Sequence, residues 1–179
     1  MSAECYSGSV ERRVWIPQRI CLKAKSLREA GFTSYRDWVY YAHNVYIGRQ
    51  NKYTGALSSK WANPYKLQDF SRPDSLILFE WKVRSNSFLM NSLTELEAKN
   101  LGCYCYSNLP CHGQVLIKLF REWYAIPDVI PDGSPFRVRL GSKETARWER
   151  QNQTERQRLL SIIESRYRRN TRDSYTLKY

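Results

Sequence analysis

The alternation of short apolar segments with longer helical segments is the feature that most constrains the fold of this chain. Three segments, 12–16 (RRVWI), 44–48 (NVYIG) and 101–106 (LGCYCY), have the length and the β-branched or aromatic content of strands. Helical segments lie between and after them, and two connections are long enough for crossovers between parallel strands. This order predicts an α/β fold with a small, partly parallel sheet and helices packed on it.

Helix-start signals place the helices of this fold. Ser71 precedes Pro73 and Asp74, which is the arrangement of a capping serine, an early proline and an acidic third position. Thr33 is the expected N-cap of a helix in the segment TSYRDWVYYA. Other helices are expected around 26–30 and in 88–100 and 111–124. In residues 49–65 the apolar residues follow neither the helical nor the strand periodicity, and turn-forming residues are frequent. We therefore expect a long loop of the kind that often carries functional residues.

The distribution of charge separates a tail from the rest of the chain. From Arg137 onwards, twelve Lys or Arg residues stand against five Asp or Glu, in a chain of formal net charge +12. We expect a single α/β domain over 10–124, a Pro/Gly linker over 125–136, and a basic helical tail, partly disordered, over 137–179. The tail would attract polyanions; the alternative is a solvated face that only keeps the protein soluble.

The composition also bears on location. No stretch approaches the roughly 18 consecutive apolar residues of a membrane span. The first residues lack the apolar run of a secretory signal. We therefore expect no membrane association and an intracellular, cytoplasmic location, with the nucleus left open. An odd number of cysteines, five, does not suggest a disulfide framework.

Cysteine and histidine are crowded into one stretch, LGCYCYSNLPCHG, over 101–113. It holds three of the five cysteines and one of the two histidines. If the strand continues through it, Cys103 and Cys105 lie side by side on one face. Pro110 then brings Cys111 and His112 to the first turn of the next helix. The four side chains are expected to converge where a strand ends and a helix begins.

Three interpretations of this stretch remain open. Cys103, Cys105, Cys111 and His112 supply the thiolates and imidazole that zinc favours, although a one-residue gap on an extended strand does not pinch two sulfurs around an ion. Alternatively, Cys111 is a catalytic nucleophile at a helix N-terminus, with His112 as its base. In the third interpretation the cysteines are small buried hydrophobic residues and His112 caps the helix.

The long loop adds candidate ligand-binding residues. Arg49 and Lys60 would hold phosphates, Trp61 would stack a base, and Asn63 would read its edge. Ser59 adds a hydroxyl to this set, and Gly113 would let a phosphate approach the N–H groups at the helix start. The alternative is a structured loop in which Trp61 belongs to the core and the charges are solvated.

Four ordered motifs resemble the signature of an uncharacterised family of phages, viruses, bacteria and some eukaryotes, known only as a domain of unknown function. They are VYIGR (45–49), SKWANP (59–64), LGCYC (101–105) and CHGQVL (111–116), and the similarity spans roughly 12–120. The resemblance implies that the loop residues and the Cys–His residues belong to one site, and it names no reaction. The family pattern has Trp and Asp where this chain has Tyr104 and Gln114.

These observations predict a protein that binds a phosphate-bearing nucleotide or nucleic acid. The prediction leaves open whether the protein also modifies this ligand chemically. The corresponding enzyme would be a nucleotide- or nucleic-acid-processing hydrolase or transferase. The alternative is a non-catalytic module, stabilised by zinc, that binds nucleic acid or protein. In a further alternative the tail helix binds a protein partner through an apolar stripe of Leu159, Leu160, Ile163 and Tyr167.

Overall fold

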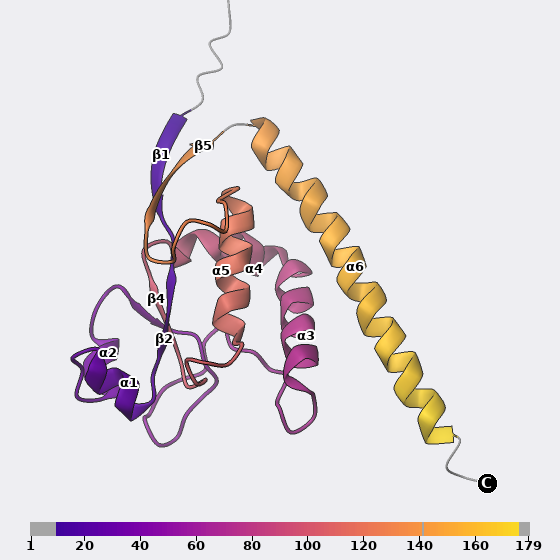
Figure 1. The fold of residues 1–179 in the computed structure, drawn as a ribbon, viewed down its shortest axis with the longest axis horizontal. Coiled ribbons are helices and arrows are strands. Elements are labelled where there is room, and N and C mark those ends of the chain that lie inside the picture. Colours follow the sequence, from indigo (N-terminus) through magenta and orange to yellow (C-terminus); the bar gives the residue numbers. More distant parts are fainter. Residues whose placement is uncertain (1–9, 141, 176–179) are drawn as a thin grey trace, which may run out of the picture.

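The computed structural model describes residues 10–140 and 142–175 and has the predicted α/β architecture (Figure 1). Strands β2 (Gln18–Cys21), β4 (Asn100–Cys103) and β3 (Asn44–Tyr46) form a parallel sheet in the order β2-β4-β3. Strands β1 (Val10–Trp15) and β5 (Pro135–Leu140) form a separate antiparallel ribbon. The helices are α1 (Ala24–Glu29), α2 (Tyr35–Val39), α3 (Arg72–Arg84), α4 (Ser87–Asn91), α5 (His112–Trp123) and α6 (Ser142–Tyr175), with the 3-10 helix η1 (Ser92–Leu96).

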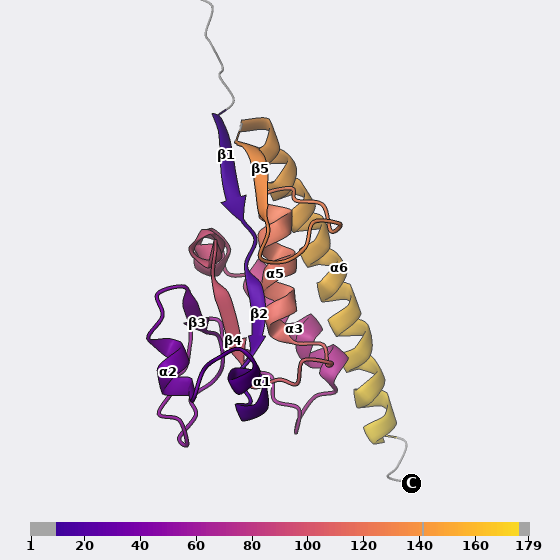
Figure 2. The ribbon, with the colours of Figure 1, turned by 60° about the vertical axis from the view of Figure 1, so that its left-hand side comes forward.

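The parallel sheet lies between two groups of helices. Figure 1 shows α1 and α2 on one side of it and α3 and α5 on the other, with α6 outermost, and Figure 2 shows the three strands side by side. The main core fills the space between the sheet and the α3–α5 layer, where Leu101 of β4 and Ile47, which follows β3, belong to one buried cluster with Phe79 and Leu116. A second, smaller core of Leu22, Leu27 and Trp38 lies on the other side. Both faces of the sheet are therefore covered, as a parallel sheet requires.

Close packing on the central strand explains Gly102. A Cβ atom at this position would lie 2.3 Å from Cη2 of Trp38, and Leu22 is also in the way. The Trp38 carbonyl accepts a hydrogen bond from the side chain of Asn44, at 2.7 Å, which ties α2 to β3. Glycine at 102 thus lets the indole lie directly on β4, the strand that ends at Cys103.

The predicted N-cap residue is correct for α3 and is wrong by one residue for α2. Ser71 caps α3, because its Oγ accepts the Asp74 N–H at 3.3 Å. The N-cap of α2 is Ser34, whose Oγ accepts the Asp37 N–H, and not Thr33 as predicted. The Thr33 N–H and hydroxyl bond instead to the carboxylate of Asp37.

Two strands, β2 and β5, were not predicted, and β5 runs across the expected boundary between linker and tail. The segment before β5 is fixed to α5, because Arg121 donates to the carbonyls of Pro127 and Ile130 at 2.8 and 2.5 Å and pairs with Asp132. Ile126 is buried in the main core. Residues 125–134 are therefore packed against the domain, and the first residues of the expected helical tail form a strand.

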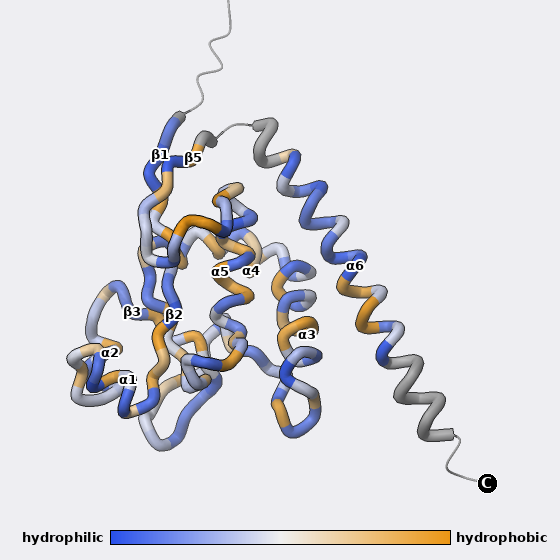
Figure 3. Tube along the Cα trace, viewed as in Figure 1, coloured by the Kyte–Doolittle hydropathy of each residue, from blue (hydrophilic) through white to orange (hydrophobic). Residues whose placement is uncertain are grey.

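The basic tail is helical, as predicted, and α6 packs along α3 and α5. Asn152 accepts a hydrogen bond from the buried Arg84, at 2.9 Å, and Leu159 is buried. Figure 3 shows that the most hydrophobic part of α6 is confined to one stretch of its length. Of the stripe proposed for partner binding, Leu160 is exposed, Ile163 is half-buried, and the side chain of Tyr167 lies outside the described residues. Within the described ranges, no helix is long and apolar enough to cross a membrane.

Candidate functional site

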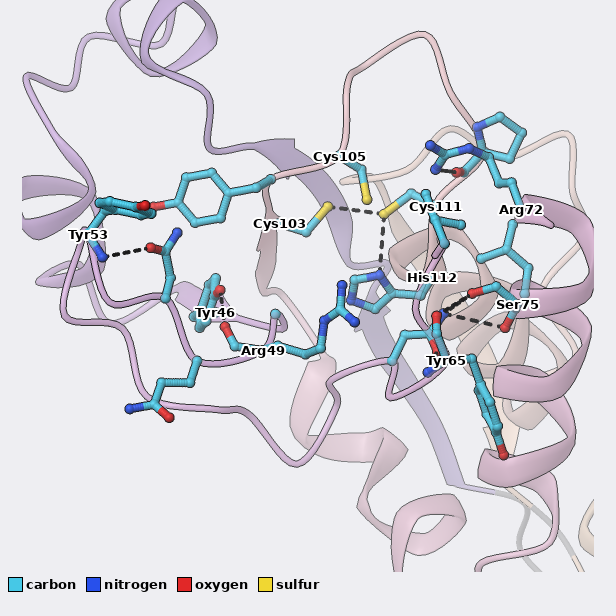
Figure 4. Close-up of a pocket in the computed structure, with 18 of the residues that line it drawn as sticks. Tyr46, Arg49, Tyr53, Tyr65, Arg72, Ser75, Cys103, Cys105, Cys111 and His112 are labelled. Atoms are coloured by element: carbon cyan, nitrogen blue, oxygen red, sulfur yellow. Dashed lines mark hydrogen bonds between the residues drawn. The ribbon is translucent and has the colours of Figure 1, made fainter. Parts of the chain in front are cut away.

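The three cysteines of the crowded stretch come together in space, and we call Cys103, Cys105 and Cys111 the thiol cluster. Their sulfur atoms all lie within 4.8 Å of one another, and the Cys103 and Cys111 sulfurs are 3.0 Å apart (Figure 4). Strand β4 stops at Cys103, so Cys105 lies in the turn that follows and not beside Cys103 on an extended strand as predicted. The bend turns the second sulfur toward Cys111, which removes the geometric objection to a metal.

Arg19 holds this turn in place from the neighbouring strand β2. Its two guanidinium nitrogens donate to the carbonyls of Leu109 and Tyr106, each at 3.0 Å. The Lys23 ammonium lies 3.8 Å from the centre of the Tyr106 ring. The turn between Cys105 and Cys111 is thus fixed by a strand that the sequence did not reveal.

The start of α5 is built around Cys111 and His112. Cys111 is the N-cap: its sulfur accepts the Gly113 N–H, and its own N–H donates to the side chain of Gln114 at 3.0 Å. Gln114 therefore has a capping role. His112 is the first helical residue and is 8% exposed, with its ring edge-on to Phe79.

The His112 ring has a defined orientation. Its Nε2 lies 2.9 Å from the carbonyl oxygen of Ile47, and its Nδ1 lies 3.7 Å from the Cys111 sulfur. A carbonyl oxygen can only accept, so Nε2 carries a hydrogen. The other ring nitrogen, Nδ1, consequently faces the thiol cluster.

The close sulfurs and imidazole shift one another's protonation. Burial alone would lower the pKa of His112, but hydrogen bonds with Cys105 and Cys111 outweigh it and raise the pKa to about 9. Hydrogen bonds with Cys103, Cys111 and His112 lower the pKa of Cys105. Hydrogen bonds with Cys105 and Cys111, together with burial, raise the pKa of Cys103. These contacts therefore favour a thiolate at Cys105 over one at Cys103, next to a His112 ring whose protonated form they stabilise.

A cavity of about 660 Å³ opens above the thiol cluster, and we call it the main cavity (Figure 4). Three of its lining side chains are cationic, four are tyrosines, and, within the described part of the chain, none is a carboxylate. The cations are Arg49, Lys52 and Arg72, the tyrosines are Tyr46, Tyr53, Tyr65 and Tyr104, and the floor includes Cys103, Cys105, Cys111 and His112. The cavity is therefore positively charged and rich in aromatic rings.

Two of the predicted ligand-binding residues, Arg49 and Asn63, line the main cavity. In Figure 4 the Arg49 side chain extends from its loop toward the His112 side of the cavity. The Asn63 amide is already used within the protein, because it donates to the Ser75 hydroxyl at 2.9 Å and accepts the Tyr65 N–H at 2.9 Å. Asn63 thus anchors the loop on α3, and the prediction that it reads a base edge does not fit these contacts.

Ser59, Lys60 and Trp61 do not lie in the main cavity. Trp61 is 2% exposed in the main core, so its ring is covered by protein and the prediction of a stacking platform is wrong. Lys60 pairs with Glu95 at 2.6 Å. Ser59 lines a neighbouring hollow, and its hydroxyl accepts the Trp61 N–H at 3.2 Å. The loop turns inward at Trp61 because burying the indole removes a large apolar surface from water.

Gly113 is not the phosphate cradle that the sequence suggested. A Cβ atom there would lie 3.1 Å from Cδ1 of Ile47 and 3.2 Å from Cγ of Arg19. The Gly113 N–H donates to the Cys111 sulfur at 3.4 Å. Protein atoms thus close the helix start, and glycine is there because α5 approaches β2 and β3 closely.

Several contributors to the site were not predicted from the sequence. They are Arg19, Arg72, the carbonyl of Ile47, and the cavity residues Lys52, Tyr46, Tyr53, Tyr65 and Tyr104. Arg72 directly follows the capping Ser71 and donates to the Pro110 carbonyl at 3.1 Å. Its place at the start of α3 was predictable, but its position opposite the cysteines depends on how α3 packs beside α5. The Ile47 carbonyl leaves no signal in the sequence, since every residue has one.

Comparisons with known proteins give a family but no activity. The family described as Domain of unknown function (DUF4326) matches residues 31–122, just over half of the chain. "Uncharacterized protein R718" of Acanthamoeba polyphaga mimivirus is 32% identical over 87 residues, which cover 44% of this chain and 67% of that protein. No solved structure matches the chain. The matched range holds the cavity loop, the start of α3, the thiol cluster and His112, and on this match the chain belongs to the DUF4326 family.

Proposed function

We propose that the protein binds a phosphate-bearing nucleotide, or the phosphorylated end of a nucleic acid, in the main cavity. The observation that carries this proposal is the lining: three cations and four tyrosine rings, with no carboxylate in the described part of the chain. The volume of about 660 Å³ falls within the roughly 300–1,000 Å³ of small-molecule sites. Phosphate oxygens require cationic or N–H donors, and a nucleobase requires a flat apolar surface.

Arg49 and Arg72 are the proposed phosphate-binding residues. The Arg49 backbone is held by the Tyr46 hydroxyl, which donates to its carbonyl at 2.6 Å, while its exposed guanidinium makes no hydrogen bond or ion pair within the described residues. Arg72 uses one nitrogen on the Pro110 carbonyl, at 3.1 Å, and keeps its other donors available. Two guanidinium groups that line one cavity could both donate to the oxygens of one phosphate.

The tyrosines supply the stacking surface that Trp61 does not. Tyr53 is fully exposed on the cavity loop, and Tyr104 lies between two cysteines of the thiol cluster. Tyr46 packs edge-on against Tyr104, with ring centres 6.2 Å apart. A base in the cavity would therefore contact Tyr46 and Tyr104, whose rings are held by their contact with each other, and the exposed Tyr53.

The proposal concerns binding, with Cys111 and His112 as part of the cavity floor. Cys111 is 1% exposed, and its sulfur accepts the Gly113 N–H and contacts Cys103. A buried sulfur with these partners is poorly placed to attack a ligand. Cys105 is half-buried and has a lowered pKa, so any thiol chemistry would begin there and not at the predicted Cys111.

A second candidate function is a non-catalytic module, stabilised by zinc, that binds nucleic acid through its basic tail. The observation that favours it is the convergence of three sulfurs within 4.8 Å, a set that could hold a metal ion. In this candidate the main cavity has no ligand. Binding would then depend on the salt concentration and on α6, and would be insensitive to Arg49.

Titration calorimetry with adenosine 5′-monophosphate tests the first candidate, with adenosine as the matched probe that lacks phosphate. We expect the monophosphate to bind and adenosine to bind much more weakly. Arg49→Gln and Arg72→Gln should each weaken binding about tenfold or more, since a hydrogen bond to a charged group contributes roughly 1.5–3 kcal/mol. Arg28→Gln is the control, because Arg28 is exposed at the end of α1 and lines none of the cavities described here.

Two results would contradict the cavity proposal. One is the absence of binding to any of the four common nucleoside 5′-monophosphates and to a 5′-phosphorylated oligonucleotide. The other is binding that Arg28→Gln weakens as much as Arg49→Gln does. A preference for the oligonucleotide over the mononucleotides would identify a nucleic-acid end as the ligand.

A further inference from the structure

We infer that Cys103, Cys105, Cys111 and His112 form a closed, four-ligand Zn²⁺ site beneath the main cavity. This goes beyond the proposed function, since it specifies the metal, its fourth ligand and its role, and it holds whatever the cavity binds. Zinc in structural sites takes four ligands in a tetrahedron, and three cysteines with one histidine are a common set.

The sulfurs are placed as a tetrahedral ion requires. In such a site Zn–S is about 2.3 Å, which places neighbouring sulfurs about 3.8 Å apart. The three sulfurs here lie within 4.8 Å of one another, and the Cys103 and Cys111 sulfurs, which are 3.0 Å apart, would separate by about 0.8 Å to bind one ion. They also approach from different directions, because Cys103 ends β4, Cys105 lies in a turn and Cys111 caps α5.

His112 would supply the fourth ligand after a shift of its ring, since the donor atoms that lie within 4.8 Å of one another are the three sulfurs. Metal-bound imidazoles usually donate their second N–H to a carbonyl or carboxylate, which fixes the tautomer and the ring direction. The Ile47 carbonyl has this role here, at 2.9 Å from Nε2, and it leaves Nδ1 on the side of the sulfurs, 3.7 Å from Cys111. The ion would take the place of a proton on Nδ1.

Two of the three sulfurs of the thiol cluster are deeply buried. Cys103 and Cys111 are each 1% exposed, and their sulfurs are 3.0 Å apart. Within the described residues, no Lys or Arg side chain makes a hydrogen bond to these sulfurs. When the cysteines bind a metal ion as thiolates, the positive charge of a divalent cation would compensate theirs in this buried position.

A closed site gives zinc a structural role. Four protein ligands leave no open position for water or substrate, so the ion would not act as a Lewis acid. It would join the end of β4, the turn over 104–110 and the start of α5, and through the His112–Ile47 bond also the end of β3. All four segments border the main cavity, so the metal would hold its floor together.

Native mass spectrometry of the full chain, purified under reducing conditions without chelators, tests this site. We expect one zinc per chain, lost on denaturation, and a lower melting temperature after chelation. Replacement by Co²⁺ should give the intense visible and charge-transfer absorption of tetrahedral cobalt thiolate. Cys105→Ser and His112→Asn should each weaken metal binding. The loss should exceed the roughly 10–100-fold that is typical when a residue that only hydrogen-bonds to a metal ligand is replaced.

Two matched variants are the controls. Cys21 is a buried free cysteine that lies opposite Cys103 in the β2–β4 register, and His43 is an exposed histidine outside the cluster. Cys21→Ser and His43→Asn should keep one zinc per chain. A metal-free chain that gives no cobalt thiolate absorption would overturn the inference, as would a Cys103–Cys111 disulfide in place of a metal. The cobalt spectrum is measured on the unmodified chain, so it does not depend on whether a variant folds. Binding of adenosine 5′-monophosphate is measured separately, so the zinc site and the nucleotide site can each fail without the other.

Discussion

His112 donates its Nε2–H to the backbone carbonyl of Ile47 at 2.9 Å, across a sequence separation of 65 residues. This bond ties the first residue of α5 to the residue that follows β3. It also decides which imidazole nitrogen faces the thiol cluster. One contact therefore links the packing of the sheet and α5 to the chemistry of the cavity floor.

Replacing His112 by Phe tests the structural part of this contact. The ring volume is nearly kept, but the buried Ile47 carbonyl loses its donor, which should lower the free energy of unfolding by about 1–3 kcal/mol. Urea unfolding in the presence of a chelator measures this cost without any contribution from metal. His43→Phe, at an exposed position, should change stability by less than about 0.5 kcal/mol. Equal effects of the two substitutions would contradict the account of the bond.

Gly102→Ala should destabilise the protein, because the added methyl group would lie 2.3 Å from Cη2 of Trp38. Overpacking of this kind costs roughly 1–3 kcal/mol. The cost should shrink in a Trp38→Leu background, where the ring that causes the clash is gone. A double-mutant cycle with urea unfolding measures the coupling between the two sites. Strict additivity would show that the indole is not what excludes a side chain at 102.

The Glu80 carboxylate makes stability depend on acid pH. Burial alone would raise the pKa of Glu80, but hydrogen bonds from Lys118 and Arg84, each at 2.8 Å, outweigh it and hold the pKa below its ordinary value of 4.5. The carboxylate therefore stabilises the fold fully above the unfolded-state pKa, and this contribution is lost as the pH falls through the lower folded-state pKa.

Glu80→Gln should accordingly lower the free energy of unfolding at pH 7 by roughly 1.5–3 kcal/mol. The difference from the unmodified chain should shrink as the pH falls below 4.5, the ordinary value for this carboxyl. Urea unfolding over a pH series measures both quantities. If the difference in the free energy of unfolding stayed constant at all acidic pH values at which the protein is folded, the titration of Glu80 would not be the cause of the pH dependence.

Tyr53→Ala and Trp61→Leu should affect different properties. Tyr53 is fully exposed at the cavity, so its loss should leave stability unchanged and weaken binding of adenosine 5′-monophosphate, since base stacking contributes about 1–3 kcal/mol. Trp61 is buried in the core, so Trp61→Leu should lower the melting temperature and leave the affinity of the folded fraction unchanged. Calorimetric titration and thermal unfolding of both variants separate the two roles. The opposite pattern would restore Trp61 as the stacking residue.

Much of the fold was predictable because its signals are local. The apolar segment at β3, the capping Ser71 and the long connections between strands are properties of neighbouring residues. Strand β2 was missed because its sequence, QRIC, has polar ends and becomes a strand by pairing with β4. Strand β5 was hidden among prolines, although Pro135 is its first residue, where a missing N–H is tolerated.

The candidate site was predictable only in part. The spacing of the cysteines and His112 predicted that they lie close together, because a strand end followed by a helix start brings these positions near one another. The direction of Trp61 was not predictable, since the same residue type serves equally as a core residue and as a stacking surface. Arg72 and Arg19 reach the site through the packing of α3 and β2, which no local pattern of the sequence records.

The most direct test of the central claim is a nitrogen–proton correlation spectrum of the full chain during titration with adenosine 5′-monophosphate. We expect resonance shifts to concentrate in the loop over 46–53, in the turn over 103–112 and at Arg72, with α6 little affected. Shifts confined to α6 and the β1–β5 ribbon, or no shifts at saturating nucleotide, would contradict the claim that the main cavity is the ligand site.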